Sequence, residues 1–372
     1  MPALPDSICR VDLPARHQEI GSDFHWDGPF PPPLLPWPEN SRWYMLARHA
    51  LASILRALSD REPKLWLPSY FCGEVSQFCR QWCELREYRD DPRWPEPDWA
   101  TLAPAADDVV LAVNYFGIRG DLNWRDWRER NQCILLEDHT HDPFSEWSRS
   151  STADYALASL RKTLPVPDGA ILWSPRGLSI PQRITQNAWN GSALKCAAML
   201  RKAQYLQGRG GAAEKEGFRS LQAQGENLMR ISPVSSISPH SYALLRDGFP
   251  AVWRQQRELN LRCLLARLGD LDSAKLLFRT WPHRSVPFAV ALIFSSQAER
   301  DDCQAYLIQN QIYCPVHWPC STDQPHALEL SSRILSLPVD QRYAQQDMDR
   351  LAGILLEYSS SMKRVPSAAA IG

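Results

Sequence analysis

Lysine is scarce in this sequence, and several other features are missing from it. Only seven of the 41 Lys and Arg residues are lysines, and the net charge is −1. Proteins that bind nucleic acid or membrane surfaces usually carry a basic excess, so this balance argues against both partners. No apolar stretch approaches the roughly 18 residues of a spanning helix. Met1–Ala15 lacks the charged and apolar regions of a signal peptide.

The ten cysteines are scattered along the chain and include no Cys-x-x-Cys pair of the kind found in zinc sites. Disulfide frameworks are typical of short secreted chains, whereas this chain has 372 residues. We therefore expect reduced thiols, a cytoplasmic location and no metal bound by cysteine.

What the sequence does contain is an alternation of short apolar segments with longer amphipathic ones. Helices are expected at 47–58 and 73–82, and strands at 64–67, 83–88, 108–116, 133–137, 155–160 and 170–174. Strands that alternate with helices predict an α/β protein whose mostly parallel sheet is covered on both faces.

The same pattern divides the chain into parts. Residues 1–40, with the proline-rich run 29–38, are expected to be extended because proline excludes a helix there. Residues 41–245 form the expected large domain, which ends in a long helix at 193–223 interrupted at 208–211. A helix at 250–268, a strand at 288–294 and a helix at 297–309 predict a smaller α/β domain over 246–358. The tail 359–372 is expected to be disordered.

Three chemical features fall at the ends of these predicted segments. Cys133–Asp138 is an apolar run that ends in a carboxylate, and Asp154–Lys162 is an apolar strand that delivers a lysine. A helix begins near Ala47. Pyridoxal phosphate needs an amine, an acid partner for its ring nitrogen and donors for its phosphate, which a helix N-terminus supplies. The pattern therefore favours this cofactor.

The other lysines lack such a setting. None of them follows a predicted strand with a paired acid upstream: Lys64, Lys195, Lys202, Lys215, Lys275 and Lys363.

Six motifs, in order over residues 40–355, match those of one known family. They are Ala-Arg-His-Ala-Leu at 47–51, Leu-Pro-Ser-Tyr at 67–70, Val-Asn-Tyr-Phe-Gly at 113–117, Glu-Asp-His-Thr-His at 137–141, Cys-Pro-Val-His-Trp-Pro at 314–319 and Arg-Ile-Leu-Ser-Leu-Pro-Val at 333–339. In these motifs the chain resembles the DegT–DnrJ–StrS aminotransferases, a branch of the fold-type I pyridoxal phosphate enzymes. The resemblance implies a seven-stranded, mostly parallel sheet in the large domain and a homodimer with a shared active site.

The resemblance also implies roles for individual residues. Lys162 would hold the cofactor as a Schiff base and move protons, and Asp138 would bind the ring nitrogen. His141 would lie beside the ring hydroxyl or orient Asp138. The ring would stack on Tyr70 or Phe71, with Cys72 as the third choice.

The phosphate and the partner subunit complete the implied site. The backbone N–H groups of Arg48 and His49 would bind the phosphate, with Ser159 and Arg161 as further donors. Asn227 would reach the active site of the partner subunit. The implied reaction transfers an amino group, with glutamate as the expected donor and a keto-sugar or other carbonyl compound as the acceptor.

The residues leave alternatives open. An elimination or a decarboxylation uses the same lysine and aspartate, so the sequence does not separate these reactions from transamination. The segment Leu46-Ala47-Arg48 replaces the family's Ser-Gly-Thr and removes two hydroxyls, which allows a cofactor-less relative that acts as a binding protein. The run Asp-His-Thr-His-Asp at 138–142 also suggests a metal hydrolase.

Overall fold

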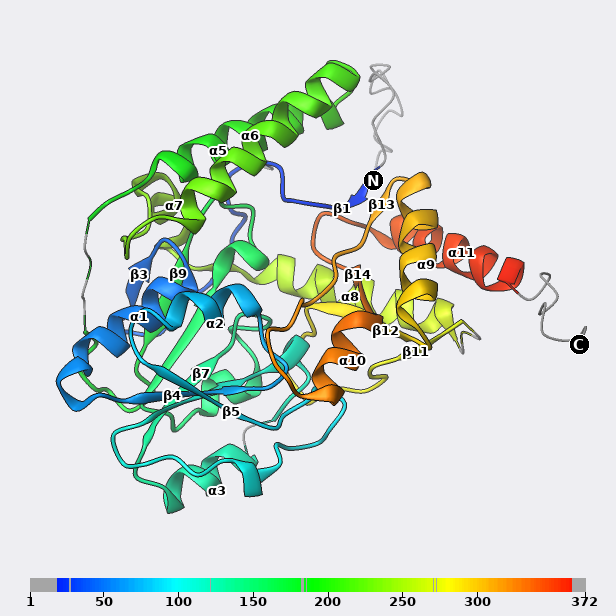
Figure 1. Cartoon of the computed structure of the whole chain (residues 1–372). Helices are drawn as coiled ribbons and strands as arrows, with labels where there is room; N and C mark the ends of the chain where they lie inside the picture. Colours follow the sequence, from blue (N-terminus) through cyan, green and yellow to red (C-terminus); the bar gives the residue numbers. More distant parts are fainter. Residues whose placement is uncertain are drawn as a thin grey trace, which may run out of the picture.

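A seven-stranded sheet organises the N-terminal part of the chain (Figure 1). The computed structural model describes residues 19–362, except 27, 121, 182, 183, 185, 270 and 272. The strand order is β3-β9-β8-β7-β6-β4-β5, and β4 to β8 pair in parallel, whereas β9 is antiparallel to both its neighbours. The strands are β3 Arg42–Tyr44, β4 Lys64–Pro68, β5 Glu84–Tyr88, β6 Val109–Val113, β7 Ile134–Asp138, β8 Tyr155–Ser159 and β9 Ala170–Trp173. The mostly parallel seven-stranded sheet is thus confirmed.

The central strands are short apolar runs because both of their faces are covered. All five residues of β6 and all four of β9 are buried. Between the strands lie α1 Ala47–Ala57, α2 Gly73–Cys79, α3 Leu122–Arg130 and α4 Glu146–Ser150. Helix α1 packs against β8 and β9, so its N-terminus lies near the ends of those strands.

Two long helices form a hairpin beside this sheet. They are α5 Asn190–Leu206 and α6 Ala212–Arg230, which pack along each other and project from the molecule (Figure 1). The predicted interruption at 208–211 is confirmed, because the two helices are separated at this point. Helix α7 Pro239–Leu245 follows the hairpin.

A second sheet lies in the C-terminal part. It has three antiparallel strands in the order β11-β12-β14, namely β11 Ala274–Leu276, β12 Ala289–Phe294 and β14 Ile334–Pro338. Around it lie α8 Ala251–Leu268, α9 Gln297–Gln309, α10 Pro325–Arg333 and α11 Gln345–Met362. Helices α8 and α11 pack together and share an apolar core with β12 and β14.

The described residues of the N-terminal segment, 19–26 and 28–40, contain no helix and pair with both parts of the chain. Strand β1 Ile20–Gly21 pairs in parallel with β13 Ile312–Tyr313, and β2 Leu34–Leu35 pairs with β10 Phe249–Pro250.

At the other end, α11 runs to Met362, so the first four residues of the expected disordered tail are helical. Residues 363–372 lie outside the described residues. Within the described ranges, no helix is long and apolar enough to cross a membrane.

Candidate functional site

Lys162 follows β8 in a single 3₁₀ turn, Leu160–Lys162, and lines a cavity of about 740 Å³. Its amine makes no hydrogen bond or ion pair with any described residue. Burial and, next, the positive charge of Arg161 lower the pKa of Lys162. The amine therefore loses its proton at a lower pH than an exposed lysine, which favours a nucleophile or a base.

Asp138 is the last residue of β7, the strand next to β8, and its Cα pairs with that of Leu157. One carboxylate oxygen accepts the N–H of Thr140 at 2.8 Å. The hydroxyl of Thr140 in turn accepts the N–H of Ser159 at 3.0 Å, so one threonine couples the ends of both strands. Burial raises the pKa of Asp138, and the hydrogen bonds from Thr140 oppose this shift.

His141 lies inside a stack of aromatic rings. Its ring is within 20° of parallel to those of Phe288 and Trp318, at centroid distances of 4.8 Å and 5.3 Å. The N–H of Phe116 donates to Nδ1 at 2.8 Å. Nδ1 therefore carries no proton, and burial, aided by the charge of Lys162, lowers the pKa of His141 to about 3. His141 is a neutral ring with its proton on Nε2.

A cluster of three cations and one carboxylate lies next to Lys162. Glu226 of α6 binds both terminal nitrogens of Arg161 at 2.7 Å and Nζ of Lys195 at 2.6 Å. Arg48, at the start of α1, is close enough for the charges of Arg161 and Glu226 to act on it. A second carboxylate, that of Glu74 at the edge of this cluster, lies 3.7 Å from Arg48, so three positive charges face two negative charges and one positive charge is in excess.

The start of α1 provides further donors for an anion. The first hydrogen bond of the helix runs from the N–H of His49 to the carbonyl of Leu46, at 3.0 Å. The N–H groups of Ala47 and Arg48, which precede His49, have no acceptor within the helix. The guanidinium of Arg48 donates to the Met229 carbonyl at 3.2 Å, but its buried Nε has no partner among the described residues.

Two more of the predicted phosphate ligands occupy different settings. The side chain of Ser159 is buried, and its hydroxyl makes no hydrogen bond to any described residue. The ring of His49 is fully buried and accepts the N–H of Ser235 at 3.2 Å, and burial lowers its pKa to about 3. The His49 ring therefore has a structural partner, whereas the Ser159 hydroxyl is free.

The three residues considered for stacking differ in their surroundings. Tyr70 is fully buried, with its hydroxyl bonded to the carbonyl of His317 and its ring against Trp318. Phe71 packs in the core of the large sheet. Cys72 is partly exposed, and of the three it is the one that is an electrostatic neighbour of Lys162.

Asn227 and Glu226 point to different sides of α6. Asn227 is exposed, and its amide oxygen accepts a hydrogen bond from Arg230 at 3.4 Å. Glu226, one residue earlier, lines the cavity. The structure thus places Asn227 away from the Lys162 cavity of its own chain.

The sequence reasoning missed Glu226 and Lys195. Lys195 is 6% exposed, lines the same cavity as Lys162, and has a pKa lowered by burial and by the charge of Arg161. The sequence gives only a weak sign that these two residues meet, because they are 31 positions apart and come together only when α5 and α6 pack against each other. His317 and Phe288, which also line the cavity, come from the C-terminal part.

The histidines of the run at 138–142 point to different partners. His139 binds Glu137 at 2.9 Å, whereas His141 lies in the aromatic stack. Across the described ranges, no group of three or more His, Cys, Asp or Glu side chains is placed to hold a metal ion.

Comparisons with known proteins extend these observations. No family model and no curated protein matches the sequence. Solved structures do match. A putative sugar aminotransferase from Streptococcus pneumoniae, in its PMP form, is 12% identical, with a TM-score of 0.61, and the match covers 87% of this chain and 88% of that one. The same protein has also been solved in its PLP form.

Two further structures are similar over most of their length. The aminotransferase TlmJ from Streptoalloteichus hindustanus is 15% identical with a TM-score of 0.59, and 87% of each chain is covered. A DegT DnrJ EryC1 StrS aminotransferase from Brucella abortus is 16% identical with a TM-score of 0.54, and 86% of each chain is covered. The chain therefore has the fold of the DegT–DnrJ–StrS aminotransferases, as its six motifs predict.

Proposed function

We propose that this protein is a divergent member of that family and an aminotransferase that uses pyridoxal phosphate. The observation that carries the proposal is the amine of Lys162. It is largely buried, has no partner among the described residues and has a lowered pKa, and it lies just after the strand next to that of Asp138. An amine and a carboxylate on adjacent strand ends are the two groups that this cofactor requires.

The residues present fit the cofactor. Among the described residues only Thr140 donates to the carboxylate of Asp138, so the carboxylate can also accept a hydrogen bond from a protonated ring nitrogen. Such a cation would also favour the ionised form of Asp138 against the effect of burial. When bound, the cofactor would supply an electron sink.

The phosphate would lie among donors that lack partners. These are the Ser159 hydroxyl, the first N–H groups of α1 and Nε of Arg48. The three cations of this cluster outnumber the carboxylates of Glu226 and Glu74 by one, which favours an anionic group such as phosphate. The two hydroxyls lost from the family's Ser-Gly-Thr segment are thus offset by charge.

Lys162 would act twice in the reaction. Its amine would hold the cofactor, and after release the neutral amine would take and return the proton at the substrate carbon. His141 and His317 face this amine as neutral rings, because burial and the charge of Lys162 lower the pKa of each. They can orient groups near the amine without adding positive charge.

We further propose a keto-sugar or related carbonyl compound as acceptor and glutamate as amino donor. The S. pneumoniae neighbour is described as a putative sugar aminotransferase, and DesI, another similar structure, was solved with its TDP-sugar product. We also propose a homodimer, which the exposed Leu228 and Ile231 near the end of α6 support, beside the exposed Asn227. Sedimentation as a stable monomer at micromolar concentration would argue against the shared site.

An absorbance titration with pyridoxal phosphate tests the proposed function. We expect a visible band of lysine-bound cofactor that disappears in Lys162→Ala and weakens in Asp138→Asn. Lys275→Ala is the matched control, because Lys275 is exposed on β11, and this variant should keep the band. A folded protein with no band under saturating cofactor, or a band that persists in Lys162→Ala, would refute the proposal.

A second measurement separates transamination from the other reactions. We expect glutamate to bleach the band and release 2-oxoglutarate in an amount equal to the enzyme. Carbon dioxide or a product of elimination, in place of 2-oxoglutarate, would assign the protein to another reaction type.

A further inference from the structure

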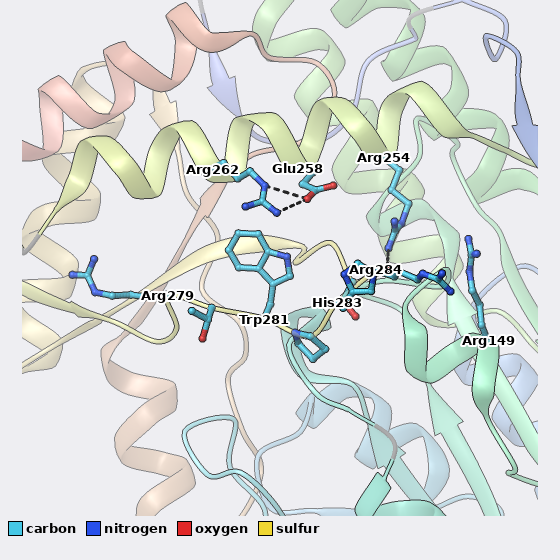
Figure 2. Close-up of a pocket in the computed structure, with 11 residues that line it drawn as sticks. Arg149, Arg254, Glu258, Arg262, Arg279, Trp281, His283 and Arg284 are labelled. Carbon is cyan, nitrogen blue, oxygen red and sulfur yellow. Dashed lines mark hydrogen bonds and ion pairs between the residues drawn. The ribbon is translucent and has the colours of Figure 1, made fainter.

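A second pocket of about 740 Å³ is lined by arginines (Figure 2). It is formed by α4, α8 and the segment 279–285, which leads into β12, and it shares no lining residue with the cavity of Lys162. Its basic residues are Arg149, Arg254, Arg262, Arg279 and Arg284. We refer to it as the arginine pocket.

The charges of this pocket are only partly balanced by protein groups. Glu258 binds Arg262 at 2.7 Å, and Asp142, behind the pocket, binds Arg254 at 2.8 Å. The nearest carboxylate to Arg284 is Glu146 at 3.8 Å. Among the described residues, neither Arg149 nor Arg284 forms a hydrogen bond to a carboxylate.

Arg149 is the arginine that lacks a partner. It is exposed at the end of α4, and its guanidinium forms no ion pair or hydrogen bond with any described residue. Figure 2 shows Arg149, Arg254 and Arg284 gathered at one end of the pocket and Arg262 with Trp281 at the other. The guanidinium carbon of Arg262 lies 5.0 Å from the ring centre of Trp281.

A buried hydroxyl in the wall provides an independent sign of a ligand. Ser285 lines the pocket and is 2% exposed, and its Oγ has no hydrogen-bond partner among the described residues. An unpaired buried hydroxyl is costly, and a ligand oxygen in the pocket would remove that cost. The adjacent N–H of Val286 is already used, since it donates to Asp142 at 2.7 Å.

The backbone also holds this end of the pocket in place. The carbonyl of Arg284 accepts a hydrogen bond from Arg254 at 2.6 Å, and Arg284 adopts a left-handed backbone conformation with φ of 58°. Arg254 thus binds both this carbonyl and Asp142, so it is fixed without any ligand. The site is preorganised, which reduces the cost of binding.

We propose that the arginine pocket binds a small molecule that carries at least two phosphate groups. Guanidinium groups bind phosphate oxygens through paired hydrogen bonds, and Arg149 and Arg284 provide two such groups at one end of the pocket, one for each phosphate of a diphosphate. The volume lies within the range of sites for small organic ligands, so there is room beyond the phosphates. This proposal does not rest on the aminotransferase function, because it uses none of the residues around Lys162.

Calorimetric titration tests this site with inorganic pyrophosphate, ADP and citrate as probes. The full chain is titrated both with and without saturating pyridoxal phosphate, so that phosphate sites near Lys162 do not account for the heat. We expect both phosphorylated probes to bind and the affinity to fall as salt is added. Tighter binding of ADP than of pyrophosphate would indicate a nucleotide as the ligand, and equal binding would indicate the diphosphate alone.

Single substitutions locate the binding. Arg149→Ala and Arg284→Ala should each weaken pyrophosphate binding about tenfold or more. Ser285→Ala should weaken it about fivefold without lowering the thermal stability of the ligand-free protein, which separates a ligand contact from a structural role. The control is Arg246→Ala, an exposed arginine outside the pocket, which should leave the affinity unchanged.

Three outcomes would overturn the proposal. They are no binding of either phosphorylated probe, an affinity that is the same in the Arg149 and Arg284 variants as in the original chain, and citrate binding as tight as that of pyrophosphate.

Discussion

Replacing Glu226 by glutamine removes the charge that holds two buried cations. Glu226 accepts three charge-assisted hydrogen bonds of 2.6 to 2.7 Å, and its partners Arg161 and Lys195 have side chains only 18% and 7% exposed. Removing one member of a buried ion pair costs about 3–5 kcal/mol, because the remaining charge stays buried. Glu226 is itself 39% exposed, so water replaces part of the interaction. We therefore expect Glu226→Gln to lower the free energy of unfolding by about 2 kcal/mol.

The effect should depend on pH in a defined direction. Burial alone would raise the pKa of Glu226. The positive charges and hydrogen bonds of Arg161 and Lys195 outweigh burial and hold this pKa well below its ordinary value. The stabilisation is then fully present above the pKa of an unfolded glutamate, about 4.3, and is lost as the pH falls through the folded value. The difference between the two proteins should be constant from about pH 6 to 8 and shrink below about pH 4.

Urea denaturation followed by tryptophan fluorescence, repeated across this pH range, measures the difference. Glu214→Gln is the matched control, because Glu214 binds Arg201 through two hydrogen bonds between the same two helices, at the surface. This control should change stability little. A Glu226→Gln protein as stable as the control at pH 7, or a difference that grows toward low pH, would refute the reasoning.

Two further predictions concern buried polar groups outside the candidate site. Arg119→Ala should cost about 3–5 kcal/mol in unfolding free energy, because Asp90, bound at 2.8 Å, would be left buried without its cation; thermal denaturation that is unchanged would contradict this. Asp168→Ala should cost about 2–4 kcal/mol, because the carboxylate accepts hydrogen bonds of 2.6 to 2.8 Å from Ser238 and Ser241. Hydrogen exchange should then be faster in α7, and equal exchange rates in both proteins would exclude this role.

The central sheet could be predicted because its strands carry the signal locally. The runs Val109–Val113 and Ile134–Asp138 are apolar, short and bounded by polar segments, so burial on both faces is evident from the sequence. The same logic placed Asp138 and Lys162 at strand ends. The edge strands and the elements near the chain ends lack this local signal. Strand β3 has only three residues, one of them exposed, so its sequence shows no alternation of apolar and polar residues.

The environment of the site could not be predicted because it depends on contacts between distant segments. The stack around His141 joins Phe116, in the turn after β6, to Phe288 and Trp318 from the C-terminal part. No spacing in the sequence indicates that these rings meet. Tyr70 lies in a matching motif, but its place in the core follows from its packing against Trp318.

The pairing of β1 with β13 has a consequence for the order in which the cavity is completed. Gly21 donates to the hydroxyl of Tyr343, 322 positions later, and the neighbouring Asp23 carbonyl accepts from both Lys202 of α5 and Arg342. These residues near the N-terminus line the cavity of Lys162. The first described part of the chain to leave the ribosome is thus among the last to find its partners. The part of the cavity wall that residues 21–24 form therefore depends on β13 and on residues 342–343, which are synthesised more than 280 residues later.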